Sequence, residues 1–137
     1  MNVCSTDFVA YVLLVGSVLV GLSLWAALPD RMAIHFGAGG APDSFVAKPV
    51  GVLLAPAIGL GAVLLIRYGP EWASRTSGSP HVEALSVVFT ASVITYAQGF
   101  VYAWNLGYRV NATVFVLVPI LLAAGLFVAY TRDGTPA

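Results

Sequence analysis

The chain has 137 residues, of which 59% are hydrophobic and only 9% are charged, and its formal net charge is zero. A soluble domain carries roughly 25% charged residues, so this composition excludes an ordinary soluble protein and indicates one that lies in a lipid bilayer. The sequence holds no basic cluster, which argues against nucleic acid as a partner.

The charged residues separate four uncharged stretches, at residues 8–28, 50–66, 84–104 and 112–130. Each stretch is 17 to 21 residues long, close to the ~20 residues with which a helix crosses the hydrocarbon layer. A helix also satisfies its own backbone hydrogen bonds in lipid. We therefore predict an all-α membrane protein, a four-helix transmembrane bundle that forms a single membrane domain over residues 1–137.

The segment between the first two predicted helices, residues 29–49, is unusually polar for this chain. It contains four of the twelve charged residues, one of the two histidines and three prolines. Proline keeps the residue before it out of α geometry, and glycine permits tight turns. We therefore expect an ordered polar loop between helices 1 and 2. Its candidate recognition residues are Pro29, Asp30, Arg31, His35, Phe36, Gly40, Pro42, Asp43 and Lys48.

Two interpretations of this loop remain open. In the first, its polar groups are structural and bond to the turn over residues 105–111. In the second, they form a recognition surface, on which His35 and Phe36 offer an imidazole and an aromatic face to a peptide or a lipid headgroup. A metal site built from His35, Asp30 and Asp43 is disfavoured, because no second histidine lies on that side of the membrane. We expect no metal and no cofactor.

Gln98 is the strongest polar group inside the third predicted helix. Because an amide in lipid needs a partner, we expect it to hold helices together rather than to touch a ligand. No ionisable side chain lies deep in any predicted helix, which argues against an ion-coupled transporter. No motif groups a nucleophile with a base and a stabilising donor, so we do not expect an enzyme. A small membrane transporter or a lipid- or ligand-binding subunit remains the alternative function.

The short turn between the third and fourth predicted helices carries three further candidates, Asn105, Tyr108 and Asn111. With four spans, this turn and the loop over residues 29–49 lie on the same side of the membrane. We therefore expect the two to touch and to form one polar cap over the bundle. Lysine and arginine are divided equally between the two sides, so the positive-inside rule gives no orientation.

Two motifs in the loop and the turn resemble one known family. The signature loop of the domain of unknown function in SdpI-type immunity proteins is similar to Leu28-Pro29-Asp30-Arg31, Ile34-His35-Phe36, Gly40-Ala41-Pro42-Asp43 and Lys48-Pro49. The family's turn between its third and fourth helices is similar to Leu106-Gly107-Tyr108-Arg109-Val110-Asn111. The resemblance covers nearly the whole chain and concerns the N-terminal, four-helix domain of that family.

The resemblance implies a multi-pass protein of the plasma membrane, with cytoplasmic termini and an extracellular loop over residues 29–49. It also implies peptide recognition, immunity or signalling through this loop. The best-known member of the family protects its bacterial host from a secreted toxic peptide and sequesters a small repressor at the membrane. The expected partners are therefore membrane lipid and either an antimicrobial peptide or a membrane-recruited repressor. That member continues into a second membrane domain, which we expect this chain to lack.

Overall fold

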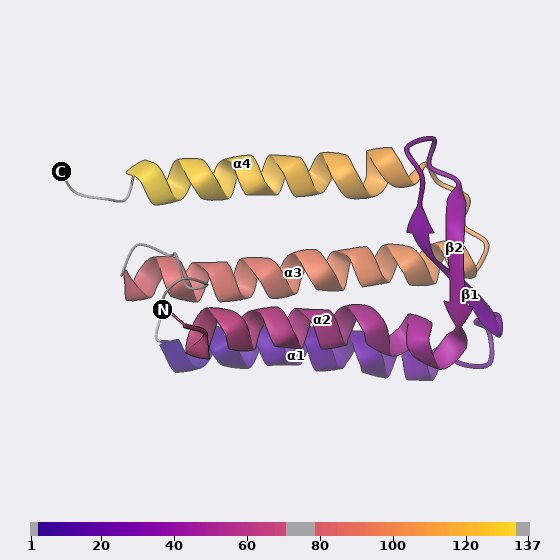
Figure 1. Ribbon diagram of the computed structural model, residues 1–137, viewed down its shortest axis with the longest axis horizontal. Helices are drawn as coiled ribbons and strands as arrows, with labels where there is room; N and C mark the ends of the chain where they lie inside the picture. The colour runs from indigo at the N-terminus through magenta and orange to yellow at the C-terminus, as the bar shows by residue number, and fades with distance from the viewer. Residues whose placement is uncertain (1–2, 71–78, 134–137) are drawn as a thin grey trace.

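The computed structural model describes residues 3–70 and 79–133, which form long helices and one short β-hairpin. The elements in chain order are α1 (Val3–Ser23), β1 (Arg31–Phe36), β2 (Pro42–Ala47), α2 (Lys48–Tyr68), α3 (Pro80–Asn105), a π-helical turn η1 (Thr113–Leu117) and α4 (Val118–Asp133). The helices run along the long axis of the molecule, and the hairpin lies across one end of them (Figure 1).

Four helices are long and apolar enough to cross a membrane, which confirms the predicted all-α transmembrane architecture. These candidate spans are Ser5–Ser23, Lys48–Tyr68, Pro80–Asn105 and Thr113–Arg132. The first helix ends at Ser23 rather than near residue 28, and turns carry the chain from there to the hairpin. The second begins at Lys48 and runs to Tyr68, so it includes charged residues beyond the uncharged stretch at both ends.

Helices α1, α2 and α3 form the core of the molecule, and small residues let them approach closely. A Cβ atom at Gly59 of α2 would lie 2.6 Å from Leu14 Cδ2 of α1 and 3.0 Å from Ile94 Cγ2 of α3. At the hairpin end, a Cβ at Gly51 would lie 2.9 Å from Met32 of β1. This agrees with the general use of small residues at helix contacts in lipid, where no hydrophobic force draws helices together.

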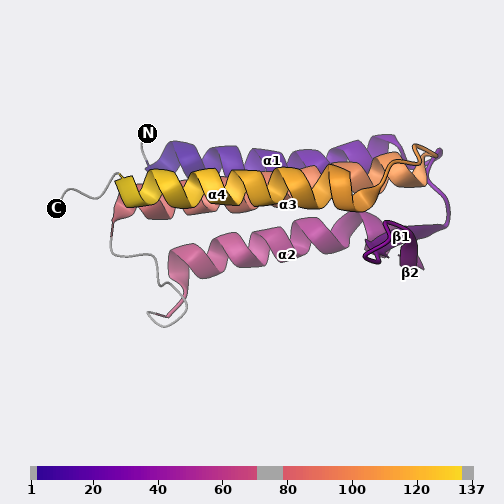
Figure 2. The same cartoon turned by 90° about the horizontal axis from the view of Figure 1, so that it is seen from above.

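Helix α4 lies beside α3 at the edge of this three-helix core (Figures 1 and 2). None of the residues in its most apolar window is buried, whereas 28% are buried in each of the other three spans. Its contacts with α3 include a stacked ring pair, Phe89 and Phe127, with centroids 4.9 Å apart. The expected compact bundle is therefore a three-helix core with a fourth helix at its side.

The start of α4 is irregular because Pro119 has no backbone N–H. In an α-helix that N–H would bond to the carbonyl of Phe115, four residues earlier. The hydroxyl of Tyr96 on α3 donates to this carbonyl instead. The preceding turn is π-helical, with the N–H of Val118 bonded to the carbonyl of Thr113. The proline thus creates an acceptor that ties α4 to α3.

The segment expected to be a loop contains two antiparallel strands. The paired residues include Arg31 with Ala47 and Ala33 with Phe45, and the register shifts on both sides of His35. At the tip, the N–H of Gly37 bonds to the carbonyl of Ala41 at 2.9 Å. β1 follows α1 and β2 precedes α2, so the two strands run in opposite directions. Antiparallel pairing can therefore satisfy their backbone hydrogen-bonding groups.

Candidate functional site

The side chain of Asn105, at the end of α3, fixes the hairpin to the helices. Its Oδ1 accepts from the N–H of Ala33 at 2.8 Å, and its Nδ2 donates to the carbonyl of Ala33 at 2.9 Å. Nδ2 also donates to the carbonyl of Val101 at 2.8 Å. The amide thus pairs with β1 as a neighbouring strand would. The expected contact between the two polar segments is present.

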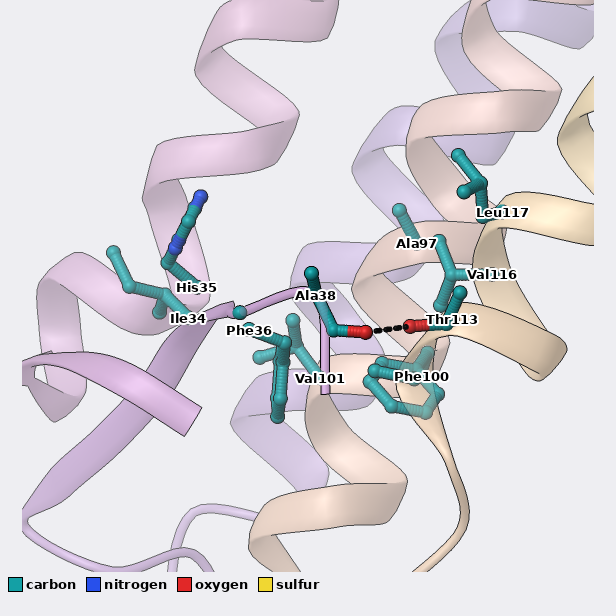
Figure 3. Close-up of a pocket in the computed structure, with 12 residues that line it drawn as sticks. Ile34, His35, Phe36, Ala38, Ala97, Phe100, Val101, Thr113, Val116 and Leu117 are labelled. Carbon is teal, nitrogen blue, oxygen red and sulfur yellow. Dashed lines mark hydrogen bonds between the residues drawn. The ribbon is translucent and has the colours of Figure 1, made fainter. Parts of the chain in front are cut away.

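The tip of the hairpin meets the turn before α4. Gly40 has φ +79°, and a Cβ there would lie 2.9 Å from Asn111 Oδ1. That Oδ1 accepts from the N–H of Val114 at 3.3 Å and so caps the first turn of η1. Thr113 Oγ1 donates to the carbonyl of Ala38 at 3.1 Å (Figure 3). Two of the candidate residues, Gly40 and Asn111, therefore have structural roles.

The base of the hairpin holds three of the predicted charged residues in local contacts. Lys48 Nζ donates to the carbonyl of Trp25 at 3.0 Å, lies 3.3 Å from Asp30 Oδ1, and sits 5.5 Å from the centre of the Trp25 ring. Arg31 Nη2 donates to the carbonyl of Phe45 at 3.3 Å. The contacts of Lys48 link the start of α2 to the turn that follows α1, and the bond of Arg31 joins β1 to β2.

His35 and Asp43 form a pair that faces outward from the hairpin. His35 Nδ1 lies 2.6 Å from Asp43 Oδ1, and the two side chains are 70% and 50% exposed. An ionised carboxylate only accepts hydrogen bonds, so His35 Nδ1 donates to Asp43, and Nε2 is the ring nitrogen that remains for a ligand. In the part of the chain that the structure describes, neither side chain hydrogen-bonds to a helix.

His35 of this pair is among the residues that line an apolar pocket of about 370 Å³. The hairpin lies along one side of it and α3 along another, and Thr113 points toward the carbonyl of Ala38 (Figure 3). The apolar residues around it are Ile34, Phe36, Ala97, Phe100, Val101, Val116 and Leu117. The pocket and the outward-facing pair together can take a ligand that has both a polar and an apolar part.

The remaining candidates are dispersed. The ring of Phe36 packs edge-on against Phe100 and Trp104, with centroids 5.1 and 5.2 Å away, and anchors the hairpin. Pro29 and Tyr108 are exposed, and Pro42 is half-buried at the start of β2. Among the described residues, no three His, Cys, Asp or Glu side chains lie close enough together to hold a metal ion.

Gln98 is buried inside the helical core, away from the pocket. Its Nε2 donates to the carbonyl of Gly51 on α2 at 2.9 Å, which confirms the predicted contact between helices. Tyr102, one turn further along α3, donates its hydroxyl to the carbonyl of Ser17 on α1 at 2.9 Å. Helix α3 is thus bonded to both of its core neighbours.

A cluster at the opposite end of the core was missed by sequence reasoning. The side chain of Arg67 is only 6% exposed, and it binds Asp7 of α1 and Glu83 of α3. Its Nε lies 2.8 Å from Asp7 Oδ1, and its Nη1 lies 2.8 Å from Glu83 Oε1. The signal was available, because these three charges fall next to the ends of three predicted helices on one side of the membrane.

Comparison with known proteins gives one match, and this match includes the hairpin. Residues 12–60 match a protein family described as "Domain of unknown function (DUF1648)". The matched stretch runs from the middle of α1 through the hairpin into α2. No curated protein and no solved structure matches the chain. The match thus supports the resemblance to a domain of unknown function. It does not connect the chain to a named SdpI-type protein.

Proposed function

We propose that this chain is a plasma-membrane protein that recognises a peptide through its hairpin, in an immunity or signalling role. The termini lie in the cytoplasm, and the hairpin lies outside the cell. The observation that carries the proposal is the outward-facing pair of His35 and Asp43, on a hairpin fixed to α3 by Asn105 and next to an apolar pocket.

The contacts of the hairpin separate structural residues from candidate binding residues. Asn105, Lys48 and Phe36 hold the hairpin to the helices. His35 and Asp43 bond to each other and are exposed, so their polarity does not serve the attachment of the hairpin. A site on a preformed, anchored element loses less conformational entropy when it binds a ligand. Recognition accounts for this combination of a fixed hairpin and an exposed polar pair.

Binding rather than catalysis is the role proposed for this pair. A histidine oriented by a carboxylate also occurs in hydrolases, where its Nε2 activates a nucleophile. Within residues 5–70 and 79–132, no hydroxyl or thiol is hydrogen-bonded to His35 Nε2. Ser44, which pairs with His35 across the hairpin, makes no hydrogen bond to its ring among these residues.

A lipid- or ligand-binding subunit is the second candidate function. It is favoured by a separate apolar pocket of about 290 Å³ between α3 and α4. The residues around that pocket are Phe89, Ser92, Val93, Tyr96, Pro119, Ile120 and Ala123. Because these residues lie within membrane spans, the apolar chain of a lipid is the ligand that this pocket suits.

A sensitivity test in cells examines the proposed function. A susceptible bacterial host is given the wild-type chain, a His35→Ala variant, a Ser44→Ala control or an empty vector, and is challenged with a panel of secreted antimicrobial peptides. The amount of each variant in the membrane is measured by immunoblotting. We expect the wild-type chain and the Ser44→Ala control to raise the inhibitory concentration of at least one peptide, and His35→Ala to abolish this protection. Unchanged sensitivity to every peptide contradicts the immunity role.

A further inference from the structure

We propose that the ligand is a basic, amphipathic peptide. A lysine or arginine of this peptide binds the pair formed by His35 and Asp43, and a neighbouring apolar side chain enters the pocket beside them. This inference rests on the proposed function, and it adds the charge and the shape of the ligand. Its evidence is the hydrogen-bonding chemistry of the pair, the surrounding charges and the lining of the pocket.

The pair offers a carboxylate oxygen to a ligand. Asp43 Oδ1 accepts from His35 Nδ1, which leaves Oδ2 as an acceptor for a second donor. Oδ2 faces Gly37, where a Cβ would lie 3.5 Å away, and Gly37 itself lines the pocket. A carboxylate oxygen suits a cationic donor and repels an anionic headgroup.

The positive charges of the cap do not neutralise this carboxylate. Lys48 is held by Asp30 and by a backbone carbonyl, and Arg31 is bonded to a carbonyl of β2. Arg109 lies over the Trp104 ring, 5.0 Å from its centre, and donates to a backbone carbonyl. In the described part of the chain, the ion pair recorded for Asp43 is the one with His35. An arriving ammonium or guanidinium group meets a carboxylate for which no ion pair with a lysine or arginine is found among the described residues.

The pocket supplies the apolar half of the recognition. Its volume of about 370 Å³ is well above that of an engineered cavity of about 150 Å³ that accepts benzene. A leucine or phenylalanine side chain fits such a space. Because His35 itself lines the pocket, the charged and apolar groups of the ligand must be close neighbours. Basic amphipathic peptides have this arrangement along the borders of their apolar face.

The test measures binding of a synthetic peptide to the full chain in nanodiscs of phosphatidylcholine, a lipid without net charge. The probe is a fluorescent amphipathic peptide of leucine and lysine, and its matched partner has every lysine acetylated. We expect the first to bind above the level of empty discs and the second to bind at least about tenfold more weakly, since hydrogen bonds to charged groups are strong. Acetylation changes only the ligand, so its effect is independent of protein folding.

Variants assign the binding to the site. Asp43→Asn is expected to weaken binding by roughly 10- to 100-fold, while Ser44→Ala, at the neighbouring exposed position of β2, leaves it unchanged. Ala97→Phe fills the pocket from α3 and is also expected to weaken binding. Leu121→Phe, on the exposed surface of α4, is its control. Circular dichroism melting curves are used to select folded variants.

Three results overturn the proposal. These are equal binding of the acetylated peptide, equal binding by Asp43→Asn, and no binding of the probe at all. If no peptide binds, and a lipid co-purifies with the wild-type chain but not with the Ala97→Phe variant, the pocket is assigned to lipid instead. The cell assay distinguishes the two proposals. If the chain protects against a neutral or acidic peptide, and the Asp43→Asn variant still protects, then the proposed function stands and only this inference is overturned.

Discussion

Replacing Asn105 by alanine tests whether its side chain fixes the hairpin. The variant removes both bonds to Ala33, which is only 1% exposed, so a donor and an acceptor of β1 lose their partners. A buried polar group left without a partner costs about 1–3 kcal/mol, so two of them cost about 2 kcal/mol or more. The bond from Nδ2 to the carbonyl of Val101 is lost as well. The backbone hydrogen bonds of α3 remain, so the loss falls mainly on the attachment of the hairpin.

Hydrogen exchange at the amide of Ala33 measures this effect directly. If the attachment weakens by about 2 kcal/mol, the amide exchanges roughly 30-fold faster, because 1.4 kcal/mol corresponds to a factor of ten. Tyr108→Ala, at an exposed position in the adjacent turn, serves as the control and leaves the rate unchanged. Unaltered protection of Ala33 in the Asn105→Ala variant would refute the anchoring role of this side chain.

Three further predictions use matched positions or a buried charge. Gly40→Ala places a side chain at φ +79° against the facing turn and lowers the stability of the hairpin by about 1–2 kcal/mol or more. Gly39→Ala meets open space and serves as its control. Protease resistance of the hairpin measures the difference between the two variants. Gly59→Ala overpacks the core and lowers the free energy of unfolding by about 1–3 kcal/mol. Gly61→Ala, whose side chain meets nothing within 4 Å, serves as its control. Denaturation in mixed detergent micelles measures the stability of both variants. Arg67→Met leaves two carboxylates without their partner and lowers the free energy of unfolding by about 2–3 kcal/mol in the same assay. This is less than the cost of breaking a deeply buried pair, because both carboxylates are partly exposed.

Each of these predictions has an outcome that contradicts it. Equal protease resistance of the two tip variants would show that the left-handed turn tolerates a side chain. Equal stability of the two α2 variants would mean that the helices do not approach as closely as described. An Arg67→Met variant as stable as the wild type would remove the charged cluster from the account of how the core is held.

The four spans were predictable because a helix that crosses a bilayer needs a long apolar stretch, which can be recognised from composition alone. Every charge falls between or near the ends of the apolar stretches, and a span count follows from their lengths. The contact between the loop and the turn followed from the same count. The position of α4 did not, because hydropathy measures affinity for lipid and says nothing about which helix is a neighbour.

The hairpin and its anchor could not be predicted from local sequence. The strands are six residues long and contain charged residues, and the register shifts around His35 obscure the alternation that marks a strand. The bond between Asn105 and Ala33 joins residues 72 positions apart, so it depends on how the end of α3 meets β1. Arg67 lies just beyond the uncharged stretch at residues 50–66, but α2 continues past that stretch to Tyr68, so Arg67 belongs to the helix.

Photo-crosslinking in living cells tests the central claim most directly, that the hairpin binds a peptide. A photoreactive amino acid replaces Ser44, which is exposed beside His35 and leaves the polar pair intact, or Tyr68, which is exposed at the opposite end of the molecule. The cells are exposed to the peptide against which the chain protects them, and then illuminated. The account predicts a crosslink from position 44 and none from position 68. Crosslinking from position 68 alone, or equally from both, would contradict it.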